Sequence, residues 1–242
     1  MNILAIITHE DPSFVGISLD GVVMEHRFEK SRLVAEQLAE ISVALLKFHN
    51  KSIKDIDAVA VIVGPGSYTG IRVGMAFAKS VVQFSERKLF AISPFDVLKF
   101  SSGISTPANR PTGGHPSRGK FSCINSPHEG CQLGRNLAGW ISSEGDNFPL
   151  IDAGRGNVYI LEDGIVNVKT FDEVKAKYDS QVFIGSGAVA NSVEVPDNLR
   201  NITVQNLCDF VDSHSPELKN YNSDFDTFVK LVPNYVQEAR IG

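Results

Sequence analysis

The first hundred residues carry apolar positions at alternating strand-like and helix-like spacings. The unbroken run Ile3–Ile7 predicts a buried strand, and Asp20-Gly21 between two apolar runs predicts a hairpin turn. Residues 58–63 form a continuous, mostly β-branched run, which is typical of a strand covered on both faces. The other elements expected here are helices at residues 32–48, 69–84 and 94–100 and a strand at 89–92. This alternation of strands and helices predicts an α/β lobe.

The middle of the chain breaks this pattern. Ser, Gly, Pro, Asn and Arg dominate the segment from 101 to 147, which has almost no periodic apolar positions and predicts an irregular insertion. After it we expect strands at 148–152, 182–184 and 201–204, a hairpin of 157–161 with 165–168, a helix at 172–178, and mixed helical patches up to Val232. The chain therefore divides into an N-terminal lobe at 1–100, an insertion at 101–147 and a C-terminal lobe at 148–242.

Composition narrows the class of protein. With 242 residues, 43% hydrophobic and 21% charged, the chain can bury a full-sized core. Its net charge of −5 argues against unaided binding of nucleic acid, although the insertion is locally basic. Cys123, Cys131 and Cys208 are odd in number and widely spread, which favours free thiols in a reducing compartment. The chain start has no basic region before its short apolar run, and no run approaches the ~20 apolar residues of a membrane helix, so a cytoplasmic protein is expected.

A glycine-rich loop, residues 64–70, joins a predicted strand to a predicted helix. Backbone N–H groups at such a junction can bind an anion, which makes Gly64, Gly66, Ser67, Thr69 and Gly70 weak candidates for cofactor binding. However, the glycine spacing is one residue longer than the dinucleotide fingerprint, and the Lys-Ser/Thr of a phosphate-binding P-loop is missing. The favoured alternative is a tight turn that lets the helix pack closely, with Ser67 or Thr69 as its N-cap.

The two long predicted helices are apolar over more than one face. In the second of them, Gly70, Gly74 and Ala78 recur every four residues and would let another helix approach closely. Such helices are either deeply buried or part of an interface. The predicted partner-interface residues are Val34, Leu38, Ile41, Leu45, Gly70, Ile71, Gly74, Met75, Ala78 and Val82. The alternative is that the second lobe covers these faces.

The insertion contains two weak resemblances to chemical sites. Residues 114–120 match the start of a P-loop, but Phe121 stands where the magnesium-binding hydroxyl belongs. His115, Cys123, His128 and Cys131 lack the pairings of common zinc sites. We therefore predict no metal site and no catalytic residue.

The segment 58–79, AVAVIVGPGSYTGIRVGMAFAK, resembles the TsaB (YeaZ) family of bacterial threonylcarbamoyladenosine biosynthesis proteins. Residues 2–6, 92–98 and 149–159 support the resemblance, which covers most of 1–100 and 148–187. It implies an α/β fold of the actin/Hsp70/sugar-kinase-like class (ASKHA), with two related lobes of mixed sheets flanked by helices.

The resemblance also implies a function. In that family the protein is a non-catalytic scaffold that forms a heterodimer with the catalytic subunit TsaD through two N-lobe helices. A third protein, TsaE, joins them, and the complex transfers a threonylcarbamoyl group to adenosine 37 of ANN-decoding tRNAs. For this chain the resemblance implies no cofactor of its own, with ATP and a metal belonging to the partner subunits. It also implies contact with tRNA only through the complex and no membrane association, and we expect that the chain could form a homodimer when alone.

The chain departs from the family's pattern after its first strand. The family usually has Asp-Thr-Ser there, whereas this chain has Ile7-Thr8-His9 and lacks the carboxylate that could position magnesium. The His-x-x-x-His of the catalytic relative is also missing from residues 32–48. Two alternatives stay open: an active ATP-dependent enzyme or glycoprotease-like metallopeptidase of the same superfamily, and an anion-binding module that uses the loop 64–70.

Overall fold

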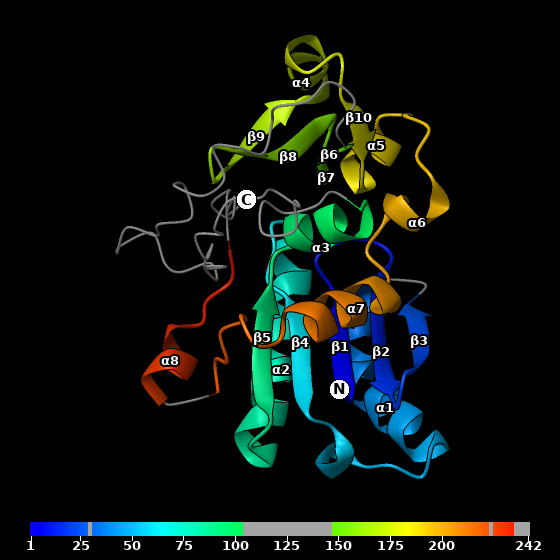
Figure 1. Cartoon of the computed structure of the whole chain (residues 1–242), viewed down its shortest axis with the longest axis vertical. Helices are drawn as coiled ribbons and strands as arrows, with labels where there is room; N and C mark the ends of the chain where they lie inside the picture. Colours follow the sequence, from blue (N-terminus) through cyan, green and yellow to red (C-terminus); the bar gives the residue numbers. More distant parts are fainter. Residues whose placement is uncertain (29–30, 104–146, 223–224, 235–242) are drawn as a thin grey trace, which may run out of the picture.

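A computed structural model describes residues 1–28, 31–103, 147–222 and 225–234. The predicted insertion therefore lies almost entirely outside the described residues, together with its P-loop-like and zinc-like patterns. Figure 1 shows a lower lobe built around one sheet and an upper lobe with two smaller sheets. The predicted lobe boundaries stay a prediction, although the C-terminal part of the chain returns to the lower lobe.

The lower lobe is built on a five-stranded mixed sheet. Its strands are β1 (Ile3–Ile7), β2 (Ser13–Leu19), β3 (Val22–Phe28), β4 (Ala58–Ile62) and β5 (Lys88–Ile92), in the order β3-β2-β1-β4-β5. β1, β4 and β5 are parallel, and the hairpin β2–β3 pairs antiparallel to β1. Side chains alternate between the two faces of β1, so Ile3, Ala5 and Ile7 enter one core while Leu4 and Ile6 enter the other.

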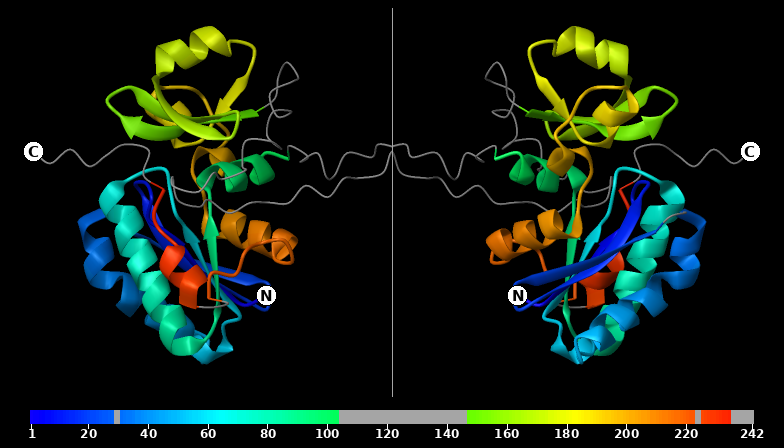
Figure 2. Two further views of the ribbon diagram at one scale, coloured as in Figure 1. Left: turned by 90° about the vertical axis from the view of Figure 1, so that its left-hand side faces the viewer. Right: turned by 90° about the vertical axis from the view of Figure 1, so that its right-hand side faces the viewer.

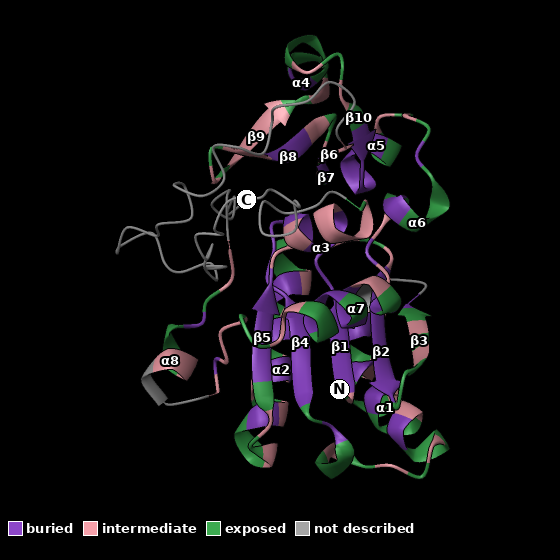
Figure 3. Cartoon of the chain, in the orientation of Figure 1, coloured by how far each residue is buried: buried purple, intermediate pink, exposed green. Residues whose placement is uncertain are grey.

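Helices cover both faces of this sheet. α1 (Ser31–Phe48) and α2 (Tyr68–Ser85) lie on one face, and α7 (Val204–His214) crosses the other, as the turned views show (Figure 2). A single 3₁₀ turn (Ile53–Asp55), capped by Ser52, leads from α1 into β4. α3 (Pro94–Ser101) starts after β5 with Ser93 as its N-cap and lies between the two lobes (Figure 1). The burial colours of Figure 3 show β1, β2 and β4 as continuously buried, whereas the edge strand β3 is mostly intermediate or exposed.

The upper lobe is assembled from short elements. They are β6 (Asn147–Pro149), β7 (Ile151–Gly154), β8 (Asn157–Glu162), β9 (Ile165–Thr170), α4 (Phe171–Lys177), β10 (Val182–Ile184), α5 (Ser186–Ala190) and α6 (Asp197–Arg200). The predicted single strand at 148–152 is in fact two strands, because β6 pairs with β10 while β7 pairs with β8. The predicted hairpin of 157–161 and 165–168 is confirmed as β8–β9.

The strand predicted at 201–204 is wrong. Thr203 is the N-cap of α7, where its hydroxyl accepts a hydrogen bond from the Asn206 amide and Asn206 reaches back to the Thr203 amide. This capping box turns the apolar residue Val204 into the first residue of a helix. α7 then packs on the lower sheet, where the Val204 side chain fills the space that a Cβ atom of residue 16 would need. A last helix, α8 (Phe225–Lys230), also belongs to the lower lobe.

In the described part of the chain, no helix is both long enough and apolar enough to span a membrane.

Candidate functional site

The glycine loop packs directly on the turn that follows β1. A Cβ atom at Gly66 would overlap the carbonyl oxygen of His9, and one at Gly70 would overlap the carbonyl oxygen of Thr8. The Thr8 hydroxyl donates to the Gly70 carbonyl at 2.7 Å, and the Ser67 amide donates to His9 O at 2.6 Å. The glycines are therefore needed for close approach of two backbones, as the tight-turn alternative predicts.

Several N–H groups of this loop already have partners within the chain. Ser67 is the N-cap of α2, which confirms one of the two residues predicted for that role. Its hydroxyl accepts a hydrogen bond from the Gly70 amide at 3.2 Å. The Ser67 carbonyl accepts from the Ile71 amide at 2.9 Å. An anion would thus meet fewer free donors here than at an uncapped helix N-terminus. Thr69 is exposed at the same end of the helix and makes no cap bond among those described.

His9 is a buried histidine beneath this loop. Its side chain is fully buried, and neither ring nitrogen has a hydrogen-bond partner. The nearest charged atom is the carboxylate oxygen Oε1 of Glu10, 3.6 Å from Nε2. Burial lowers the pKa of His9, and the neighbouring Glu10 charge opposes that shift only in part. A buried imidazole therefore lies beneath the glycine loop, and sequence reasoning did not predict its burial.

The predicted partner face lies largely inside the protein's own core. Val34 and Leu38 on α1 are buried, and Ile41 and Leu45 are half-buried against the same cluster. On α2 the buried residues are Ile71, Gly74, Met75, Ala78 and Val82, and they face the sheet. The expectation that these side chains form an exposed interface is therefore corrected: the row that repeats every three to four residues is the one that covers the sheet.

The opposite faces of the same helices are exposed and partly apolar. Phe84 near the end of α2 is 86% exposed, and Phe48 and Val43 on α1 are 75% and 48% exposed. Small residues accompany them, since Ala39 and Ala76 are also exposed. Exposed phenylalanines on adjacent packed helices are unusual for a monomer surface, where large apolar patches mark interaction sites. The sequence predicted that both helices are apolar over more than one face, but only the helix phase relative to the sheet shows which apolar residues face outward.

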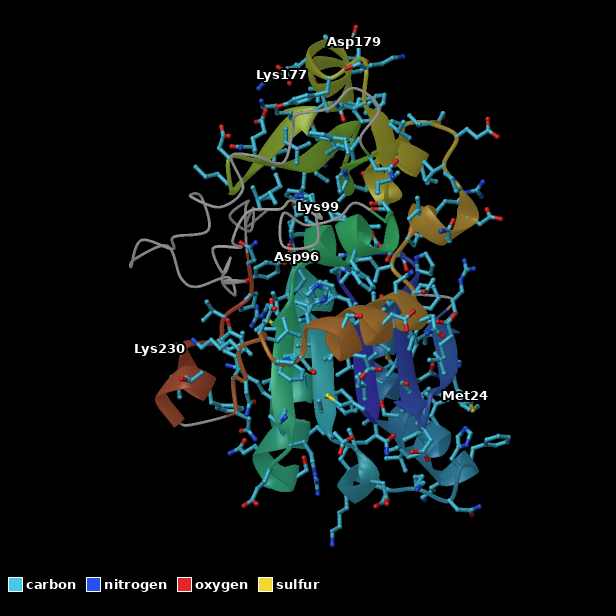
Figure 4. The ribbon with its side chains drawn as sticks, in the orientation of Figure 1. Met24, Asp96, Lys99, Lys177, Asp179 and Lys230 are labelled. Carbon is cyan, nitrogen blue, oxygen red and sulfur yellow. The ribbon has the colours of Figure 1, made fainter. Side chains whose placement is uncertain are left out.

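A second group of ionisable residues lies on α3, between the lobes. Burial raises the pKa of Asp96 and lowers the pKa of Lys99 to about 8, while each charge partly opposes the other's shift. Figure 4 shows both residues on this helix. Among the described residues, no group of three or more His, Cys, Asp and Glu side chains is arranged to hold a metal ion. Cys208 is a buried free thiol, as expected, and burial raises its pKa to about 12; Cys123 and Cys131 lie outside the described residues.

Comparison with known proteins finds sequence similarity to TsaD and TsaB over part of the chain. The family model of TsaD, tRNA N6-adenosine threonylcarbamoyltransferase, matches residues 21–113, a range that contains both α1 and α2. The tRNA threonylcarbamoyladenosine biosynthesis protein TsaB of Escherichia coli (strain K12) is 31% identical over 93 residues, which are 38% of this chain and 40% of that protein. The matched segment thus spans less than half of the length of this curated relative.

Solved structures extend the likeness to the whole chain. An uncharacterized Pseudomonas aeruginosa protein with similarity to peptidase YEAZ has a TM-score of 0.60, at 16% identity over 98% of this chain and 99% of that one. YeaZ from Pseudomonas aeruginosa has a TM-score of 0.58, at 16% identity over 97% of this chain and 99% of its own. The chain is thus similar to TsaD and TsaB sequences over part of its length and to YeaZ structures over nearly all of it. The TsaB-like fold, a mixed α/β architecture of the actin/Hsp70/sugar-kinase-like class, confirms the fold that the sequence resemblance implied.

Proposed function

We propose that this chain works in tRNA threonylcarbamoyladenosine biosynthesis as a non-catalytic scaffold that binds a TsaD-type catalytic subunit. The observation that carries the proposal is the exposed outer face of α1 and α2, with Phe84, Phe48 and Val43 standing out of a closely packed helix pair. The chain's likeness to TsaB supplies the biosynthetic process, and the family resemblance of the sequence suggests the class of partner. In this proposal a TsaE-type ATPase joins the assembly, and tRNA is bound only through the complex.

The chemistry of the described residues favours a scaffold role over a catalytic one. Ile7 stands where the resemblance would place a carboxylate, and His9 in the turn after β1 is buried with a lowered pKa. Within the Gly64–Gly70 loop, Gly66 packs against the His9 backbone and Gly70 against the Thr8 backbone. We therefore propose that ATP and the metal of the reaction are held by the other subunits.

The proposal is tested by mixing the chain with the TsaD-type protein of the same source and measuring mass by size-exclusion chromatography with light scattering. We expect a 1:1 complex that buries about 800 Å² on each partner. Phe84→Glu places a charge on the outer face, so the affinity should fall by at least about tenfold, as for an interface hot spot. Because Phe84 is 86% exposed, the free energy of unfolding should change by less than about 0.5 kcal/mol.

Ile165→Glu is the matched control, because Ile165 is a large apolar residue that is 64% exposed on β9 of the upper lobe. It should leave the complex intact. Leu38→Glu is unsuitable as an interface probe, since Leu38 is buried in the core and a charge there would unfold the lower lobe. Absence of any complex with the wild-type chain would contradict the scaffold proposal and favour an anion-binding or enzymatic role, to be tested by nucleotide binding to the isolated chain.

A further inference from the structure

The C-terminal part of the chain runs along the whole length of α2. We call residues 220–222 and 225–234 the C-terminal strap. At one end, the Asn222 side-chain amide donates to the carbonyls of Val82, at 3.4 Å, and Arg87, at 2.8 Å, where α2 ends. At the other end, the Asn234 amide donates to Val63 O at 2.9 Å, just before the Gly64 loop from which α2 starts. Figure 2 shows α8, within the strap, beside α2 on the same side of the sheet.

The strap also closes the outer edge of the sheet. The Tyr221 amide donates to Leu89 O at 2.8 Å, and the Leu89 amide donates to the Asn220 side-chain oxygen at 3.0 Å. Tyr221 and Leu231 are buried in the core cluster that contains the inner face of α2. Between these anchors α8 is only partly buried, and Val229 is 54% exposed. The strap is therefore fixed at its ends and needs a further contact to hold its middle against α2.

Lys79 supplies that contact. Its ammonium group donates to Leu231 O at 2.6 Å and lies 5.1 Å from the centre of the Phe228 ring. A charged donor on a backbone carbonyl makes a stronger hydrogen bond than a neutral donor, and the aromatic face adds a cation–π attraction. Burial lowers the pKa of Lys79, which indicates a site partly shielded from water. Lys230, which follows on the same strap, is exposed instead (Figure 4).

We propose that Lys79 is a positioning residue: it fastens the C-terminal strap to α2, and the strap in turn fixes the Gly64–Gly70 loop through Asn234. The link to the loop is short. Asn234 bonds to Val63, and the Asn234 carbonyl oxygen lies 3.0 Å from where a Cβ of Gly64 would stand. Loosening the strap at Lys79 therefore frees the loop and the first turn of α2. Where this inference extends to partner binding it rests on the proposed function, because α2 is the helix proposed to meet a TsaD-type subunit.

Hydrogen exchange of the full chain tests the fastening without any partner. Lys79→Met removes the charged hydrogen bond but keeps the length of the side chain, so amide exchange should rise on the order of tenfold or more in the strap. The same rise should reach the amides of Ser67, Gly70 and Ile71, which are distant in sequence from the strap. Lys79→Arg should restore protection, because it keeps a charged donor. The control Lys88→Met alters an exposed lysine at the start of β5 and should change neither region.

A second variant separates fastening from simple destabilisation of α2. Asn234→Pro removes the amide that donates to Val63 and leaves Lys79 untouched. Amide exchange should rise in the Gly64–Gly70 loop, whereas the strap amides around Leu231 should keep their protection. Unchanged loop exchange in Lys79→Met, with the strap loosened, would overturn the proposal, because the strap would then not position the loop.

The affinity for the TsaD-type protein distinguishes a positioning role from a purely structural one, because substitution of a purely structural lysine would leave this affinity unchanged. Lys79→Met should weaken the complex by a factor comparable to its effect on loop exchange, and Lys79→Arg should restore it. An equal or higher affinity of Lys79→Met would overturn the positioning role in partner binding, since the strap would then be neutral or a competitor. If the wild-type chain binds no partner while loop exchange responds as expected, the proposed function fails and the fastening by Lys79 stands.

Discussion

Gly70 illustrates how one backbone contact decides the role of a residue. It lies in the first turn of α2, and a Cβ atom there would overlap the carbonyl oxygen of Thr8, the residue that follows β1. Helix propensity alone predicts that Gly70→Ala stabilises the protein by up to about 1 kcal/mol. We expect the opposite, a loss of about 1–3 kcal/mol from overpacking, measured by urea unfolding. The control Thr69→Ala changes the exposed neighbour and should stay within about 0.5 kcal/mol; a stabilised Gly70→Ala would contradict the close packing described here.

At the residue scale, local chemistry was easier to predict than burial. The choice of Ser67 or Thr69 as the N-cap of α2 follows from residue type, and the structure selects Ser67. The burial of His9 could not be predicted, because His9 is covered by the Gly66–Ser67 backbone, which lies more than fifty residues further along the chain. Nothing in the residues around His9 signals that contact.

At the scale of elements, Glu162 ties the β8–β9 hairpin to α4. It accepts hydrogen bonds from the ammonium groups of Lys169, at 2.7 Å, and Lys177, at 2.8 Å, and from the Tyr178 hydroxyl at 2.6 Å. Partial burial opposes ionisation, but these donors outweigh it and lower the pKa of Glu162 to about 2. A carboxyl whose pKa is lowered by folding contributes stability above its unfolded pKa, near 4.5, and loses that contribution as the pH falls toward 2.

We therefore expect Glu162→Gln to lower the free energy of unfolding by about 2 kcal/mol at pH 7 and by much less at pH 3. Urea unfolding at the two pH values measures the difference. The control Glu194→Gln alters an exposed glutamate and should show no such pH dependence. An equal loss at both pH values would mean that hydrogen bonding to the neutral group, rather than its charge, joins these elements.

The elements themselves follow well from the hydrophobic pattern where apolar positions are dense, as for α1 and β4. Periodicity failed where tertiary context chose between states. The residues 201–204 have a strand-like composition, but the Thr203–Asn206 capping box starts a helix there. The α2 residues predicted as a partner face cover the sheet instead, because a helix with two apolar rows does not reveal from sequence which row meets the sheet. The close approach of Gly74 to the Thr8 side chain fixes that orientation in the folded chain.

At the scale of the whole molecule, the lower lobe is completed by residues far along the chain. α7 covers the face of the sheet that carries Ile3, Ala5 and Ile7, and the amino group of Met1 forms an ion pair with Asp212 of α7 at 2.9 Å. The C-terminal strap closes the β5 edge and part of the other core. A division into sequential lobes thus describes the order of the elements but not the packing units, because α7, which forms one layer of the lower lobe, and the strap at the β5 edge both come from residues after 200.

This arrangement predicts how fragments of the chain behave. Residues 1–103 alone would expose one face of the sheet and the β5 edge, so we expect no cooperative thermal transition and a tendency to aggregate. Adding residues 147–242 should restore α7 and the strap in trans and recover a cooperative transition with native-like hydrogen-exchange protection of β1. The control for the loss of chain connectivity is the folded full-length protein cut once between residues 103 and 147. This cut protein should keep the cooperative thermal transition. A cooperative transition of 1–103 by itself would mean that β1, β4 and β5 with α1 and α2 are sufficient, and that α7 and the strap are additions to a lobe already stable without them.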